Sequence, residues 1–241
     1  MIKISTLLGR SYVPLNKITI SRKQLIANYH CLNALHKNIP IAPVLKSNAY
    51  GHGLNLVAPL LDKLNPPFFC VDSLYEAYEL KKLRVKTPVL IMGYVAPENL
   101  KVKKLNFSYA IYDYHQAEVL NKFQKGAKIH IKVDTGMHRL GIPIHNLDTL
   151  IKKIRNLKHI RIEGLMSHLS SPKTFPDYTK FQIKNYKIAL KILEKNNINP
   201  KWKHLAASGG LLNYGREIEK ITNLSRVGIS LFGLYRTNKV S

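Results

Sequence analysis

The sequence predicts an α/β fold, a TIM-type (β/α)8 barrel of eight parallel strands with outer helices. Short runs of β-branched and other apolar residues alternate along the chain with segments of helical periodicity, which favours a parallel sheet. The 241 residues are about the right length for one barrel, and 45% of them are hydrophobic, which is enough for one large core.

Eight apolar runs are the candidate strands, at residues 41–47, 67–72, 88–93, 107–113, 128–134, 161–168, 202–208 and 223–232. Between them, apolar residues recur at steps of three and four, as in Leu147, Leu150, Ile151 and Ile154, which predicts helices with one apolar face. We expect residues 1–14 to be an N-terminal extension, 15–233 to form the barrel and 234–241 to be a short tail.

Start signals mark two of the helices. Ser21 with Gln24 and Ser73 with Glu76 fit the capping box, in which the serine hydroxyl and the third side chain satisfy free amides. The helix opened by Ser21 precedes the first strand, and we expect it to cover one end or side of the barrel. Residues 172–176, with a proline at each end, predict a substantial loop after the sixth strand.

Cysteine usage and hydropathy limit the cellular context. The two cysteines, Cys31 and Cys70, form no C-x-x-C pair, and we expect a reducing compartment, the cytoplasm. No uninterrupted apolar run approaches the length of a membrane span, which is about 18 residues, and the N-terminus has no signal-peptide pattern. We therefore predict no membrane partner.

The net charge of +24 raises a competing hypothesis, a basic module that binds nucleic acid. The lysines and arginines are scattered along the predicted helices, without zinc-finger spacing, an RNP string or a basic tail. A lysine-rich solvated surface explains this distribution better, so we expect no nucleic-acid partner and keep the basic module as the lesser alternative.

A lysine ends the first predicted strand, in the string VLKSNAYGHG at residues 44–53. In a barrel, Lys46 would lie at the C-terminal end of a strand, where it could form a Schiff base with a carbonyl cofactor. Four other polar residues follow or occupy later strands and should meet it at the same mouth of the barrel: Arg139, His168, Ser208 and Arg226.

The string at residues 44–53 resembles the cofactor-lysine signature of the alanine racemases, enzymes that use pyridoxal phosphate to interconvert L- and D-alanine. Three later strings extend the resemblance in the right order. KVDTGMHRLG at 132–141 is similar to the substrate-arginine segment, EGLMSH at 163–168 to the histidine strand, and RVGISLFG at 226–233 to the last-strand signature.

The resemblance implies pyridoxal phosphate as cofactor, alanine as substrate, and catalytic roles for Lys46, Arg139 and His168. Lys46 would hold the cofactor and, as an uncharged amine, move the proton at Cα on the face used for D-alanine. Arg139 would bind the substrate and stabilise charge on the phenolic oxygen of the cofactor. His168 would pack against the ring and support Arg226, and Tyr50 would donate its hydroxyl to the phosphate.

By the same resemblance, Arg226 would face the pyridine nitrogen. An arginine is always protonated and cannot accept a proton, so this nitrogen would stay unprotonated and act as a weaker electron sink. Ser208 and the backbone amides of Gly228 and Ile229 would hold the phosphate.

Three departures from the family pattern stand out. Ala207 replaces a usual asparagine, and Phe232 replaces a common tyrosine. The sequence also stops soon after the last predicted strand, whereas the resemblance implies a further C-terminal β-domain. That domain would carry the opposite-face catalytic tyrosine and substrate contacts across a dimer.

Racemisation needs an acid–base group on each face, so we expect reduced or absent racemase activity. A homodimer or a separately encoded C-terminal half could complete the site. The main alternative is a non-catalytic barrel that binds pyridoxal phosphate.

Overall fold

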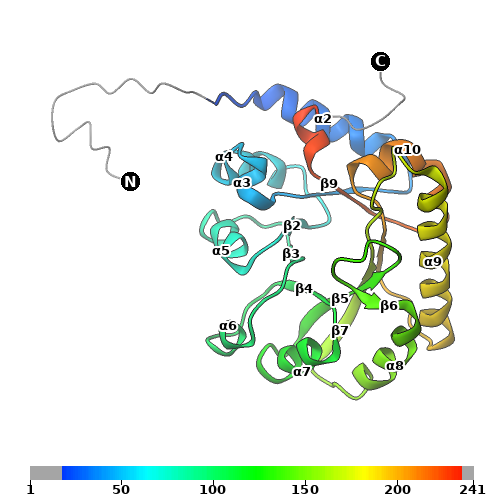
Figure 1. Cartoon of the computed structure of the whole chain (residues 1–241). Helices are drawn as coiled ribbons and strands as arrows, with labels where there is room; N and C mark the ends of the chain where they lie inside the picture. Colours follow the sequence, from blue (N-terminus) through cyan, green and yellow to red (C-terminus); the bar gives the residue numbers. More distant parts are fainter. Residues whose placement is uncertain (1–17, 235–241) are drawn as a thin grey trace.

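The eight predicted strands all occur in the computed structural model, which describes residues 18–234. They form parallel pairs in a barrel with helices on the outside, so the predicted TIM-type fold is confirmed (Figure 1). The strands are β1 (Ile41–Pro43), β2 (Phe69–Val71), β3 (Val89–Ile91), β4 (Ser108–Ile111), β5 (Ala127–Asp134), β7 (Ile160–Met166), β8 (Trp202–His204) and β9 (Ser225–Val227). A short additional strand, β6 (Ile142–Pro143), pairs with β5.

Neighbouring strands follow the order β2-β3-β4-β5-β7-β8, and β1 pairs separately with β9. Backbone hydrogen bonds join these two sheets at both seams. The Leu45 amide donates to the Cys70 carbonyl at 2.8 Å beside β2, and the Arg226 amide donates to the Ala206 carbonyl at 3.0 Å just after β8. The barrel of the described strands is therefore closed, with no long unpaired edge among them.

Helical segments follow the strands, most of them on the outside of the barrel. They are α2 (Arg22–Ala34), α3 (Lys46–Tyr50), α4 (Leu54–Asp62), α5 (Leu74–Lys82), α6 (Pro97–Lys101), α7 (Tyr114–Phe123), α8 (Ile144–Ile154), α9 (Pro176–Lys195) and α10 (Ser208–Ile218), with the 3₁₀ helix η1 (Ile229–Phe232). Helix α2 lies beside η1, and the Asn28 side chain donates to the Leu231 carbonyl at 2.9 Å (Figure 1). The helix opened by Ser21 thus covers one side of the barrel, as predicted.

The apolar core has two parts. A large cluster fills the space between the strands and the outer helices, with residues such as Ile41, Ile129 and Leu211. A smaller cluster fills the inside of the barrel and includes Phe68 and Cys70. This division follows from strand alternation, because successive side chains point to opposite faces.

Seven of the eight predicted strands end earlier than expected, and the difference is largest, at four or five residues, for three strands that lead into the mouth. The first stops at Pro43, and Lys46 begins α3 instead. The seventh stops at His204, and Ser208 begins helix α10. The last stops at Val227 and continues as η1. Apolar periodicity does not mark these ends because the mouth segments remain partly buried after the strand pairing stops.

The two capping boxes differ. At α5 both halves form, because Ser73 Oγ accepts from the Glu76 amide and the Glu76 side chain accepts from the Ser73 amide. At α2 only the serine half forms, because the Gln24 side chain donates to Asn28 instead. The predicted loop at 172–176 ends where α9 begins at Pro176.

The N-terminal extension predicted at residues 1–14 lies outside the described residues, as does all but Leu234 of the predicted tail. In the described part of the chain, no helix combines the length and the apolar character needed to cross a membrane.

Removing the complete capping box should destabilise the fold more than removing the half box. We expect Ser73→Ala to lower the free energy of unfolding by about 1 kcal/mol and Ser21→Ala by less, because only Ser73 belongs to a reciprocal pair. Urea denaturation of both variants measures the difference. A loss at Ser21 equal to or larger than that at Ser73 would contradict this interpretation.

Candidate functional site

The C-terminal ends of the strands surround a cavity of about 810 Å³. Such a mouth is where barrel enzymes place their active sites. The structure brings all of the predicted site residues to its lining: Lys46, Tyr50, Arg139, His168, Ser208, Arg226, Gly228 and Ile229.

Lys46 lies at the start of a tight turn with left-handed backbone. Ser47, Asn48 and Ala49 have φ near 54° and ψ near 48°, a conformation that non-glycine residues rarely adopt. Glu76 holds this turn, because its carboxylate accepts from the Ser47 amide at 2.5 Å and from the Asp72 amide at 2.8 Å. The cap of helix α5 therefore also fixes the segment that presents Lys46.

Arg139 lies on the loop between β5 and β6. Asp134 Oδ1 accepts from three successive amides of this loop, those of Gly136, Met137 and His138, at 2.8–3.1 Å. Burial pushes the pKa of Asp134 upward, but these hydrogen bonds outweigh it and lower the pKa. The Arg139 side chain is exposed at the rim of the cavity, where it is free to meet a ligand.

Arg226 is the most enclosed cation of the site, with an exposed fraction of 3%. Its Nη2 donates to the Ser167 carbonyl at 2.5 Å and lies 3.4 Å from His168 Nδ1. Its Nη1 donates to the His204 carbonyl at 3.0 Å and lies 2.7 Å from His204 Nδ1. These bonds tie β9 to the ends of β7 and β8.

His168 is uncharged at neutral pH. Burial, with Arg226 and Arg139 adding positive charge nearby, lowers its pKa to about 3. Its Nδ1 faces Arg226, which has only donors, so this nitrogen accepts. The structure thus brings His168 into contact with Arg226.

Ser208, Gly228 and Tyr50 form a small cradle on one side of the cavity. The Gly228 amide donates to Ser208 Oγ at 3.3 Å, and a Cβ on Gly228 would lie only 2.3 Å from the Tyr50 hydroxyl. Burial raises the pKa of Tyr50, with Cys70 and Asp72 adding to the shift, so its hydroxyl stays a donor. Helix α10 starts here, and its N-cap, Ala207, supplies no side-chain acceptor to the first amides.

The cavity is strongly cationic. Its lining holds Lys46, Lys132, Arg139, Lys173 and Arg226 against a single carboxylate among the described residues, that of Asp72. Such a lining favours an anionic ligand, and the free amides at the start of α10 favour a phosphate group.

Lys132 and Asp72 are lining residues that sequence reasoning did not single out. Burial lowers the pKa of Lys132, the positive charges of Arg139 and Arg226 add to the shift, and the pKa falls to about 8. Strand alternation could have identified Lys132, since Lys128, His130 and Lys132 occupy every second position of one buried strand.

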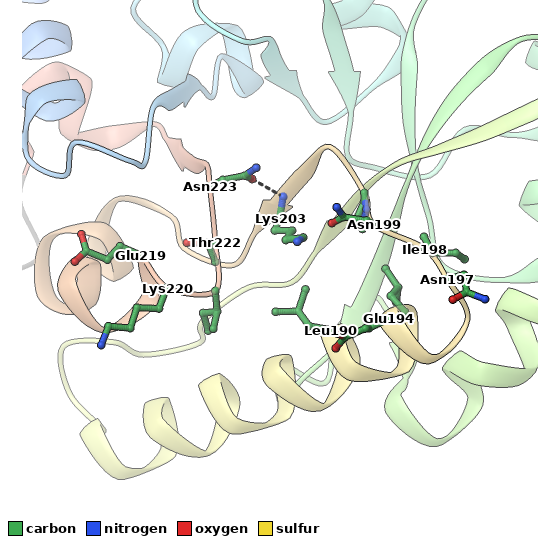
Figure 2. Close-up of a pocket in the computed structure, with 13 residues that line it drawn as sticks. Leu190, Glu194, Asn197, Ile198, Asn199, Lys203, Glu219, Lys220, Thr222 and Asn223 are labelled. Carbon is green, nitrogen blue, oxygen red and sulfur yellow. Dashed lines mark hydrogen bonds between the residues drawn. The ribbon is translucent and has the colours of Figure 1, made fainter.

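A second hollow, of about 790 Å³, lies where β8 and β9 begin, at the opposite end of the barrel (Figure 2). Its lining includes Leu190, Glu194 and Lys220, and the Lys203 amide donates to Asn223 Oδ1 at 2.8 Å. None of the predicted site residues lines it. Barrel enzymes carry their active sites at the C-terminal ends of the strands, so the mouth, and not this hollow, is the candidate site.

Comparison with known proteins connects this mouth to a family. A family profile described as alanine racemase, N-terminal domain, matches residues 20–236. The alanine racemase of Helicobacter pylori strain G27 is 38% identical over 213 residues, which cover 85% of this chain and 56% of that protein. That of Citrifermentans bemidjiense is 33% identical over 230 residues, covering 89% and 60%. The chain spans about 60% of the length of such relatives.

Solved structures share the fold. The alanine racemase of Clostridium difficile 630 superposes with a TM-score of 0.84 at 27% identity, covering 90% of this chain and 62% of that one. A histidine racemase from Leuconostoc mesenteroides gives 0.80 at 23% identity, covering 96% and 63%. At that lower identity the likeness shows the fold alone.

The lowered pKa of His168 predicts a loss of stability in acid. The unfolded chain binds a proton at this residue below its ordinary pKa of about 6.5, whereas the folded protein does so only near 3. Stability therefore falls as the pH falls below about 6.5, by about 2 kcal/mol at pH 5 for this group.

Urea unfolding at pH 7 and pH 5 measures this loss, with His168→Gln as the comparison. The variant should lose about 2 kcal/mol less than the unmodified chain between the two pH values. Equal losses would show that His168 titrates normally in the folded protein.

Proposed function

Because this chain belongs to the alanine racemase family and matches its N-terminal domain, we propose that it binds pyridoxal 5'-phosphate at the barrel mouth and acts on alanine. Lys46 is the proposed attachment point of the cofactor and the proton carrier on one face of the substrate. The observation that carries the proposal is the meeting of Lys46, the cradle of Ser208, Gly228 and Tyr50, and further cationic side chains in a single cavity.

The residues present fit this cofactor. The cradle of Ser208, Gly228 and Tyr50 offers hydroxyl donors and a backbone close approach that a side chain at Gly228 would block. The uncapped amides at the start of α10 suit a phosphate, whose binding there would replace the missing side-chain cap. The cationic lining suits both the phosphate and the carboxylate of an amino acid.

Pyridoxal phosphate, when bound, supplies an aldehyde that condenses with amines and a ring that withdraws electrons from the substrate Cα. The chain's residues would divide the remaining work. Lys46 would take up or return the Cα proton on its own face. Arg139, on its anchored loop, would orient the substrate carboxylate, and His168 would pack beside the ring as a neutral side chain.

Arg226 would face the pyridine nitrogen and keep it unprotonated, because arginine can only donate. This limits the electron demand of the ring, so the proton returns to Cα in preference to other outcomes. Three carbonyl oxygens at the ends of β7 and β8 hold the guanidinium in place for this role: those of Ser167, His204 and Leu205.

A barrel that binds the cofactor without turnover is the second candidate. Among the described residues that line the cavity, Tyr50 is the only tyrosine, and its hydroxyl points at the backbone of Gly228 in the proposed phosphate cradle. Tyr50 is therefore not placed to be the second acid–base group, on the far face of the substrate, that racemisation requires. We propose that a partner subunit or a separate C-terminal segment contributes this group.

Cofactor binding should depend on Lys46. The purified chain mixed with pyridoxal phosphate should develop a visible absorption band distinct from that of the free aldehyde, because a Schiff base forms. Lys46→Ala should lose the band, while Lys173→Ala, which removes another lysine from the same cavity, should keep it. An unchanged spectrum in Lys46→Ala would contradict the proposed attachment point.

If Lys46 is the one proton carrier that the chain supplies, the Cα hydrogen of alanine should exchange with solvent without inversion at Cα. In D₂O, the purified chain with cofactor should exchange the Cα hydrogen of D-alanine at least about 100-fold faster than it forms L-alanine, because general acid–base groups contribute factors of this size. Mass spectrometry and chiral chromatography measure the two rates.

Comparable exchange and inversion rates would mean that the chain itself holds a second proton carrier. Cofactor binding with neither reaction would favour the non-catalytic candidate.

A further inference from the structure

A line of three side-chain contacts runs through the inside of the barrel from the cavity. Arg226 Nη1 lies 2.7 Å from His204 Nδ1, and His204 Nε2 lies 2.8 Å from His130 Nδ1. His130 Nε2 in turn lies 3.4 Å from Glu163 Oε2. The four residues come from β9, β8, β5 and β7, so the line crosses the barrel interior from the mouth toward the end where the strands begin.

The donors along this line determine the position of each ring proton. Arginine has only donors, so His204 Nδ1 accepts from Arg226 and the His204 proton lies on Nε2. That proton is donated to His130 Nδ1, which leaves the His130 proton on Nε2, facing Glu163. All three hydrogen bonds therefore point the same way, from the cation to the carboxylate.

Both histidines are neutral, as this arrangement requires. They are fully buried, with exposed fractions of 0%. Burial lowers the pKa of His130, and burial together with Arg226 lowers the pKa of His204 well below its ordinary value. The ring of Phe68 packs edge-on against both of them, at 5.5 and 6.0 Å between ring centres.

A register shift places Glu163, and a glycine in the neighbouring position makes room for His130. The register between β5 and β7 shifts, so that Ile129 pairs with Ile162 but His130 pairs with Gly164, leaving Glu163 as the extra residue of a bulge. A Cβ on Gly164 would lie 2.2 Å from His130 Nδ1, so only glycine leaves room for the ring. A bulge changes the direction of one side chain, and here that side chain is Glu163, the last residue of the line.

Glu163 is ionised. Burial pushes its pKa upward, but hydrogen bonds from His130 and Lys128 outweigh this and lower it to about 2. Lys128 Nζ lies 3.0 Å from Glu163 Oε1, and Ser108 Oγ donates to Oε2 at 3.2 Å. The Lys128 side chain is 55% exposed, so this ion pair contributes little by comparison with the buried contacts.

We infer that Glu163 is a positioning residue for Arg226, acting through His130 and His204. Without the carboxylate, the His130 proton can move to Nδ1, and the His204 proton then moves to its own Nδ1, where it opposes the Arg226 donor. The guanidinium would have to turn away. That this matters for the cofactor rests on the proposed function, in which Arg226 faces the pyridine nitrogen.

The first experiment measures the ring protons without any cofactor. Long-range ¹⁵N–¹H correlation spectra of the uniformly labelled chain should show His204 and His130 protonated on Nε2. Glu163→Met, which removes the acceptor at similar size, should populate the Nδ1–H form at both rings. Lys128→Met is the matched control, since it removes only the exposed partner of Glu163 and should leave both rings unchanged.

Glu163→Gln tests rescue, because its amide carbonyl can still accept from His130 and should retain the Nε2–H forms. If Glu163→Met does not fold, His130→Phe breaks the same line. The measured quantity is then the His204 ring proton, which should populate Nδ1 in this variant. Rings that keep their protons on Nε2 in Glu163→Met, or a shift of equal size in Lys128→Met, would overturn the inference.

The second experiment adds pyridoxal phosphate. We expect Glu163→Met to weaken its binding about fivefold to tenfold and to shift its bound absorption maximum, since one buried hydrogen bond at Arg226 is lost. Lys128→Met should bind as the unmodified chain does. Unchanged binding and absorption in Glu163→Met would overturn the positioning role.

One outcome would count against the proposed function without deciding the inference about Glu163. If the unmodified chain bound no pyridoxal phosphate, the proposed function would fail, and the ring protons would decide whether Glu163 positions Arg226.

Discussion

The structure depends on satisfying one buried charge, the guanidinium of Arg226. A cation with 3% exposure is costly to bury unless its donors are matched, and removing one partner of such a group commonly costs several kcal/mol. Here the carbonyls of Ser167, His204 and Leu205 and the rings of two histidines match them. These partners all lie at the ends of β7 and β8, so the charge is satisfied only when the barrel closes against β9.

The same closure assembles the rest of the mouth. Beyond Arg226 the chain turns at Gly228, whose lack of a side chain admits the Tyr50 hydroxyl from the segment that follows the neighbouring strand β1. Tyr50 belongs to the left-handed turn that Lys46 begins, and Glu76 holds that turn in a conformation its residues would not adopt alone. The strain is local to the proposed site, where a fixed lysine is useful, and the cap of helix α5 supports it.

Much of the fold could be predicted from the sequence, because strand and helix periodicities alternate clearly from residue 41 onward. The gathering of Lys46, His168 and Arg226 at one mouth follows from the same pattern, since parallel strands end at one edge. The left-handed turn could not be predicted, since Ser47 and Ala49 carry no glycine-like signal. The proposed role of Glu163 depends on a register shift between two strands, which no single segment encodes.

The central claim is that Lys46 is the lysine to which the carbonyl cofactor attaches, in a chain with 38 lysines and arginines. Borohydride reduces a Schiff base to a stable secondary amine, so treating the chain with pyridoxal phosphate and then borohydride marks the attached lysine permanently. Peptide mass mapping should find the pyridoxyl group on Lys46 at near-stoichiometric yield, with only traces elsewhere. A label spread over surface lysines, with Lys46 unmodified, would contradict the account.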